Sequence, residues 1–224
     1  MIRPLLFVWL VFMMAVFSVT AQSGVPEKHA DEAYWNVVSK RAEKIVEKLN
    51  VSDPDRQVRV KNLIAQQYYD LNGIHDGLKA KKALVKKESP NSEGVELKIR
   101  RLQQKAGQKL AKLHDKFLKN LSKELSPEQV EGVKDGMTYG VVPITYAGYL
   151  DMIPALTQEE QLQIKAWLIE AREHAMDAGS SEEKHGWFAK YKGRINNYLS
   201  SRGYDLKKLS KEQEEKIRKA GKSN

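Results

Sequence analysis

Two long segments with a helical repeat of apolar residues constrain the fold of this chain more than any other feature. They run from about residue 54 to 87 and from about residue 93 to 124, and in each the apolar residues recur every three or four positions. The short break between them contains Pro90, which cannot continue a helix. Two long helices joined by so short a connection pack as antiparallel neighbours, so the sequence predicts a helical hairpin.

Start signals for further helices follow along the chain. In a capping box, a Ser or Thr accepts a hydrogen bond from the third helical N–H, and a Glu or Gln at that position reaches back. The pattern begins at Ser126, Thr157, Ser180 and Ser210. Another helix is expected over about residues 28 to 49, and no long stretch alternates apolar and polar residues as a strand would. The prediction is an all-α helical bundle that includes the hairpin.

The stretch from residue 137 to 156 has no clear helical repeat. It contains or adjoins several glycines and two prolines, and it carries Tyr139, Tyr146 and Tyr149. We expect an irregular loop with at most a short helix over about residues 146 to 152. Long irregular segments in compact helical domains are uncommon and often functional, which makes these tyrosines candidate ligand contacts. The alternative is an apolar plug across the end of the bundle.

The N-terminal residues predict export. Arg3 precedes an apolar run over residues 5 to 19, and small residues follow that suit a signal peptidase. We expect a signal peptide over residues 1–21, a single helical domain over 22–206 and a polar tail over 207–224 that could form a short helix. A retained membrane anchor is the alternative. After cleavage, no membrane-spanning segment is expected, and the protein would be periplasmic or secreted.

The net charge is +9 and the chain has no cysteine. The absence of cysteine excludes disulfides, thiolate nucleophiles, a lipid-carrying N-terminal cysteine and zinc sites built on thiolates. No histidine spacing typical of a metal site and no phosphate-binding or dinucleotide motif occurs, so no cofactor is expected. A basic chain suits acidic partners such as uronic-acid glycans, while export argues against nucleic acid.

Six lysines share one face of the second long segment. They are spaced three or four residues apart, as side chains on one side of a helix are. They are Lys105, Lys109, Lys112, Lys116, Lys119 and Lys123. One interpretation is a stripe that binds a polyanion. The other is the solvated face of an amphipathic helix, whose lysine stems cover apolar neighbours.

A second group of candidate ligand contacts lies towards the C-terminus. Trp187, Tyr191 and Arg194 fall along one side of a predicted helix, and Asn197 lies beside them. Sugars are bound by aromatic faces that meet C–H groups, and by amide and guanidinium donors that bridge hydroxyls. The alternative is that much of this side is core, which is the expectation for Ile195.

His75 is a further candidate. Gly73 and Gly77 thin one face of the helix near it. That thinning admits either a ligand beside His75 or a neighbouring helix, and helix packing is the more common cause.

Four stretches carry a resemblance to a known family. Ala30–Trp35, Tyr139–Pro143, Ala175–Gly179 and Lys190–Leu199 resemble segments of a secreted Bacteroidota family of uncharacterised activity, to which sugar binding has been attributed. The family is often encoded beside glycan-degradation genes. The resemblance implies a glycan context, and it carries no established catalytic residues.

Two other stretches resemble a different family. Leu125–Gln129 and Leu156–Gln161 are similar to the Leu-Thr-x-x-Gln signature of small periplasmic helical chaperones, although capping boxes share this pattern.

Three functional hypotheses follow. The first is an exported glycan-binding accessory protein, whose ligand could be acidic. The second is a glycan-active enzyme, a lyase or hydrolase; in the lyase a Tyr or His would abstract a proton and Arg or Lys would neutralise a carboxylate. The third is a periplasmic helical chaperone. The sequence determines neither the ligand nor the oligomeric state.

Overall fold

The computed structural model describes residues 31–88 and 94–220. Within these ranges the chain forms eight helices and no strand, which confirms the predicted all-α class. The helices are α1 (Glu32–Val46), α2 (Pro54–Glu88), α3 (Gly94–Glu124), α4 (Pro127–Met137), α5 (Val141–Met152), α6 (Gln158–Met176), α7 (Ser181–Ser201) and α8 (Leu206–Ala220). The expected signal peptide lies outside the described residues. Among the described helices, none is long and apolar enough to cross a membrane.

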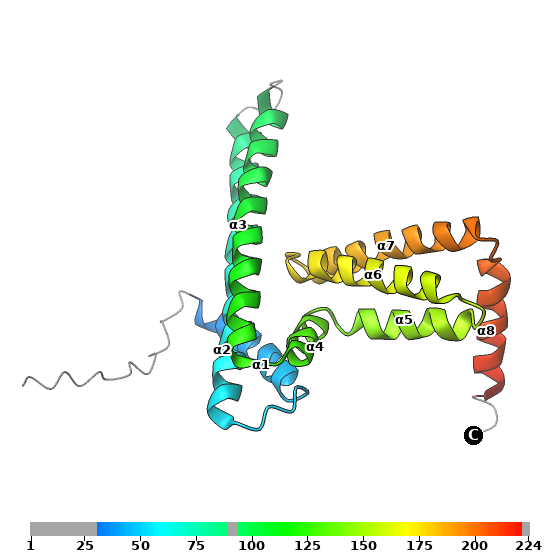
Figure 1. Cartoon of the computed structure of the whole chain (residues 1–224). Coiled ribbons are helices and arrows are strands. Elements are labelled where there is room, and N and C mark those ends of the chain that lie inside the picture. The colour runs from blue at the N-terminus through cyan, green and yellow to red at the C-terminus, as the bar shows by residue number, and fades with distance from the viewer. Residues whose placement is uncertain (1–30, 89–93, 221–224) are drawn as a thin grey trace, which may run out of the picture.

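The predicted hairpin is present as α2 and α3, which lie side by side in opposite directions (Figure 1). α1 packs along α2, and α4 contacts α1, α3 and α6. α5, α6 and α7 extend away from the hairpin, and α8 crosses their far end, where it contacts α5 and α7 (Figure 1). The C-terminal tail, predicted to be polar with at most a short helix, therefore contains most of α8.

Most helix starts agree with the capping patterns. Ser126 and Thr157 form complete capping boxes. The side chain of Ser180 caps α7. The start predicted at Ser210 is wrong, because the carboxylate of Asp205 already accepts from the first turn of α8, which begins upstream of Ser210.

The stretch expected to be an irregular Tyr/Gly/Pro loop is more helical than predicted. α5 takes up most of it, so the irregular parts are only the turns on either side. Pro143 lies in the first turn of α5, where its missing N–H costs no helical hydrogen bond. The turn before α5 uses two residues with positive φ, Tyr139 at 61° and Gly140 at 65°. Glycine and proline therefore delimit a helix here and do not prevent one.

The buried apolar residues form two cores. The first is built by α1 to α4 and includes Val38, Ile64, Leu121 and Val133. The second is built by α5, α6 and α7, includes Ile164, Leu168, Ile195 and Leu199, and is covered in part by α8. Met176, at the end of α6, packs into the first core, so α6 reaches both.

Charged side chains join the two cores. Arg172 of α6 is 2% exposed, pairs with Glu131 of α4, and lies 2.7 Å from a carboxylate oxygen of Asp135. On α3, His114 lies 3.0 Å from a carboxylate oxygen of Asp177. These contacts hold the α6–α7 end of the second core against the first.

Candidate functional site

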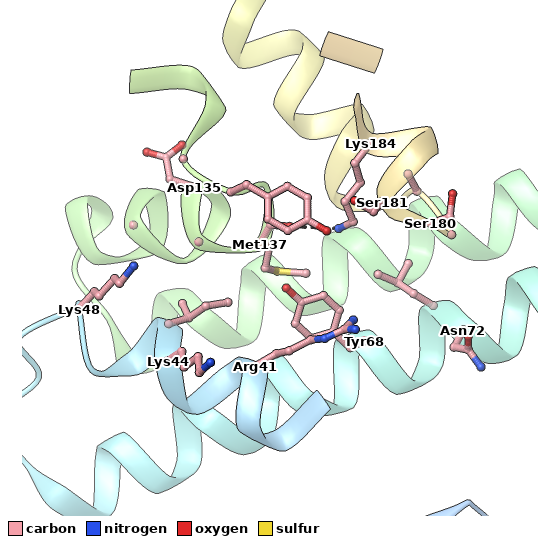
Figure 2. Close-up of a pocket in the computed structure, with 18 of the residues that line it drawn as sticks. Arg41, Lys44, Lys48, Tyr68, Asn72, Asp135, Met137, Ser180, Ser181 and Lys184 are labelled. Atoms are coloured by element: carbon pink, nitrogen blue, oxygen red, sulfur yellow. Dashed lines mark hydrogen bonds between the residues drawn. The ribbon is translucent and has the colours of Figure 1, made fainter. Parts of the chain in front are cut away.

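A cavity of about 990 Å³ lies where the two cores meet. Its walls come from α1, α2, α4, the turn into α5, and the turn between α6 and α7 with the start of α7 (Figure 2). The volume is at the upper end of the range typical of ligand sites. Because the walls come from widely separated parts of the chain, the cavity exists only in the folded protein.

Four cationic side chains line this cavity. Arg41 and Lys44 lie on α1, Lys48 lies in the turn that follows it, and Lys184 comes from the first turn of α7. Within residues 31–88 and 94–220, none of the four forms an ion pair with a carboxylate. Asp135, the acidic residue of the wall, is paired with Arg172. The cavity therefore carries an excess of positive charge.

Lys184 is the buried member of the four, at 6% exposure. Its Nζ donates a hydrogen bond to the carbonyl oxygen of Met137 at 3.1 Å, and it lies 5.6 Å from the centroid of the Tyr68 ring (Figure 2). Burial lowers the pKa of Lys184 to about 8; the charge of Asp177 opposes this shift, and the charge of Arg41 adds to it. No carboxylate of the described residues forms an ion pair with Lys184, so an anion in the cavity would be its direct partner.

Three tyrosines add aromatic surface to the cavity: Tyr34, Tyr68 and Tyr139. Burial raises the pKa of Tyr68 well above its usual value, so its hydroxyl stays protonated. Tyr139 is 53% exposed and stacks on His185, with ring centroids 5.5 Å apart and planes at 14°. Its positive φ is uncommon for a bulky residue, and such backbone strain is concentrated at functional sites.

Of the eight residues that the sequence singled out, Tyr139 alone lines this cavity. Tyr149 and Tyr191 are each 6% exposed and pack in the second core. The Tyr149 hydroxyl donates to Oδ1 of Asn196 at 2.7 Å. Ile195 is fully buried, as expected. Much of the aromatic side of α7 is thus core.

The remaining predicted residues of this group lie on the surface of the second core. Trp187 stacks on His174 at a centroid distance of 4.3 Å. The guanidinium of Arg194 lies 4.5 Å from the ring centroid of Trp167. Tyr146 is half-buried and Asn197 is exposed. The structure therefore does not gather Tyr139, Tyr146, Trp187 and Arg194 around the cavity.

His75 borders a second, smaller cavity that shares Gly179 and Ser180 with the first. Its Nε2 donates a hydrogen bond to the carbonyl oxygen of Asp177 at 2.7 Å. A Cβ built on Gly179 would lie 2.6 Å from Cγ of His75, so the imidazole packs directly on the turn that leads into α7. In this arrangement the ring of His75 acts as a structural contact of the cavity wall.

Sequence reasoning missed Arg41, Lys44, Lys48, Lys184 and Tyr68. Arg41, Lys44 and Lys48 carried a readable signal, because a spacing of three and four residues is typical of positive charge on one side of a helix, although α1 ends before Lys48. Lys184 carried none. Its burial depends on α7 meeting α2 and α4, which no local pattern reveals.

The side chains of the cavity offer positive charge and aromatic surface. No group of His, Asp and Glu side chains in the described part of the chain is arranged to hold a metal ion. The cations offer charge-assisted hydrogen bonds to a carboxylate, sulfate or phosphate, and the tyrosines offer ring faces and hydroxyls.

Comparison with known families gives one assignment. Residues 35–219 match the family described as "Protein of unknown function (DUF3826)". This range contains most of α1 and all of α2 to α7, and therefore nearly the whole cavity wall. The comparison with curated proteins found no match. Because the match covers most of its length, the chain belongs to the DUF3826 family.

Proposed function

We propose that this protein binds an acidic glycan in the cavity between its two cores. The observation that carries the proposal is the set of four cavity cations, Arg41, Lys44, Lys48 and Lys184, that lack a carboxylate partner among the described residues. Positive charge focused in a cavity with low-dielectric walls attracts anions and concentrates them there.

A sugar carboxylate suits the inner end of this site. Lys184 is buried beside the ring of Tyr68, and an isolated buried cation is costly unless it is paired. A carboxylate next to Lys184 would remove that cost. The charge of Arg41 lowers the pKa of Lys184, so the two cations influence each other. The guanidinium of Arg41 can bind the same sugar carboxylate through two hydrogen bonds.

The tyrosines and the volume favour a carbohydrate over a small inorganic anion. Tyr139 presents an exposed ring at the rim of the cavity, where the C–H face of a sugar can stack. A space of about 990 Å³ exceeds what one small anion fills and admits a short oligosaccharide. The family likeness read from the sequence, which implies a glycan context, agrees with this. Export, as residues 1–21 predict, is part of the proposal.

Calorimetric titration tests the proposal with a short oligogalacturonide as the acidic probe. Its methyl-esterified form is the matched neutral probe, and a sulfated oligosaccharide and inorganic phosphate show whether another anion is preferred. We expect Lys184→Met and Arg41→Gln to weaken binding of the acidic probe about tenfold or more each. Arg194→Gln makes the same charge change outside the cavity and should leave affinity unchanged.

Two results would contradict the proposal. One is equal affinity for the acidic and the esterified probe. The other is an affinity that depends on Arg194 or Trp187 but not on Arg41 and Lys184. That result would place the binding site on the surface of the second core.

A second candidate function, cleavage of the same ligand by β-elimination, is favoured by the environment of Lys184. A neutral amine can take the proton from the carbon next to a carboxylate while a cation such as Arg41 stabilises the enolate. A C=C bond then forms as the bond from the neighbouring carbon to the leaving oxygen breaks, and the leaving oxygen takes a proton from the Lys184 ammonium just formed or from water. Appearance of the unsaturated, ultraviolet-absorbing product, abolished in Lys184→Met, would establish this activity; binding without product identifies a receptor.

A further inference from the structure

A separate recess runs along the hairpin and shares no lining residue with the cavity between the two cores. We call it the hairpin trough. It has a volume of about 640 Å³ and lies between residues 69–81 of α2 and residues 102–116 of α3. At 1.5 Å per residue, these spans make it about 20 Å long, which is three to four helical turns.

The floor of the hairpin trough is apolar and incompletely covered. Ile74 and Leu78 of α2 and Leu102 and Leu113 of α3 line it, and all four are only half-buried. After Leu71, no residue of α2 is buried, although the helix continues to Glu88. Two helices by themselves cannot enclose the apolar seam between them, so this face of the hairpin has room for a third element.

Two glycines deepen the trough on the α2 side. A Cβ built on Gly73 or on Gly77 would meet nothing within 4 Å. Both residues line the trough, one helical turn apart. The absence of side chains at these two positions allows the backbone of a third helix to approach α2 closely.

Lysines form the rim of the trough. They are Lys81 on α2 and Lys105, Lys109, Lys112 and Lys116 on α3. None of the five forms an ion pair with a carboxylate of the described ranges. Asp70, the acidic residue of the lining, accepts a hydrogen bond from Gln66 at 2.8 Å. The rim is therefore strongly positive above an apolar floor.

We propose that the hairpin trough docks an acidic amphipathic helix of a partner protein. The apolar strip of such a helix fits the floor, its backbone passes over Gly73 and Gly77, and its flanking carboxylates meet the lysine rim. A trough three to four turns long matches a short helix in length. A flat lipid surface reaches the rim but not the floor between the helices, and a second copy of this face would bring two lysine rims together.

The test uses the purified protein and a synthetic amphipathic helix about four turns long, with leucines along one side and glutamates on both flanks. A peptide with lysines in place of the glutamates is the matched control. Fluorescence anisotropy should show saturable binding of the glutamate peptide alone. Lys109→Glu with Lys112→Glu should weaken it about tenfold or more.

Two further variants separate the trough from general charge. Lys119→Glu with Lys123→Glu makes the same charge change on the same helix outside the trough, and should leave affinity within about twofold of wild type. Gly73→Leu with Gly77→Leu places two side chains in the open space of the trough. It should abolish peptide binding without lowering the melting temperature and without changing oligogalacturonide binding in the cavity.

The proposal is overturned if the glutamate peptide does not bind, or binds no better than the lysine peptide. Equal loss in the two lysine double variants would also overturn it, because charge alone would then explain the affinity. Binding of phosphatidylglycerol vesicles without peptide binding would assign the face to a lipid surface. A dimer in analytical ultracentrifugation that Gly73→Leu with Gly77→Leu dissociates would assign it to a second copy of the chain.

Discussion

The Nε2 atom of His75 lies 2.7 Å from the carbonyl oxygen of Asp177 and donates a hydrogen bond to it. The carboxylate of the same Asp177 lies 3.0 Å from the imidazole of His114. His75 belongs to α2 and His114 to α3, so both arms of the hairpin hold the end of α6. The chain then turns into α7, which places Lys184 in the wall of the cavity. The hairpin thus positions part of the cavity wall.

The contact between His75 and Gly179 can be tested by the substitution Gly179→Ala, which adds one methyl group. A Cβ at residue 179 would lie 2.6 Å from Cγ and 2.8 Å from Nδ1 of His75, so the imidazole must shift and lose its bond to Asp177. We expect Gly179→Ala to lower the free energy of unfolding by about 1–3 kcal/mol in urea titrations. Gly186→Ala, where the new Cβ meets nothing within 4 Å, should instead raise it by up to about 1 kcal/mol. Equal effects would contradict the packing described.

His114 makes the stability depend on pH in the alkaline range. Hydrogen bonds to the carboxylates of Asp177 and Glu173 raise the pKa of His114 to about 10. The stabilisation is therefore complete below the pKa of an unfolded histidine, about 6.5, and is lost as pH rises towards 10. In thermal melts followed by circular dichroism, the difference in Tm between wild type and His114→Gln should shrink from pH 6 to pH 10. A constant difference would show that the ion pairs do not form.

Arg172 is the buried charge on which the junction depends. It pairs with Glu131 and Asp135 of α4 and is 2% exposed. Arg172→Met leaves these carboxylates near a buried site without their partner, and should cost about 3–5 kcal/mol of unfolding free energy. Denaturant titration measures the loss. Arg194→Met, which removes an exposed guanidinium near Glu170, is the control and should cost less than about 1 kcal/mol.

Removal of the charge of Lys184, unlike that of Arg172, should not destabilise the protein. The buried amine of Lys184 has no carboxylate partner among the described residues, so burial works against its charge. Lys184→Met keeps the apolar stem and removes the charge. We expect an unchanged or raised Tm at pH 7 together with weaker binding of oligogalacturonide. A large drop in Tm would mean that Lys184 is primarily a structural residue.

The affinity for an acidic ligand should fall as pH rises through about 8. The pKa of Lys184 is lowered to about 8, so the free protein loses this positive charge above that pH. A bound carboxylate favours the charged form, and binding above pH 8 should therefore be accompanied by proton uptake. Calorimetry in buffers of different ionisation enthalpy measures this uptake. It should disappear in Lys184→Met, and its persistence there would assign the proton to another group.

Local patterns in the sequence were sufficient for most of the secondary structure. The apolar repeat predicted α2 and α3, and the boxes at Ser126 and Thr157 predicted the starts of α4 and α6. The errors occurred where one residue type suits two structures. Pro143 was taken as a sign of a loop and lies in the first turn of α5, and Ser210 was taken as a cap and lies within α8.

The candidate site was much less predictable. A spacing of three or four residues shows that Trp187, Tyr191 and Arg194 share a side of α7, but it does not show which of them faces another helix. In the structure, Tyr191 is core and Arg194 is exposed. The same holds for Lys184, whose neighbours in the sequence give no sign that it is buried.

The sequence by itself determined the all-α class and the hairpin, because helix periodicity and capping depend on residues within a few positions of one another. Only the tertiary structure decided which helix faces meet. It alone brought Arg41 of α1, Tyr68 of α2, Tyr139 before α5 and Lys184 of α7 around one cavity. The reason is physical: burial and electrostatic environment depend on distances between elements far apart in the chain, and no local repeat encodes those distances.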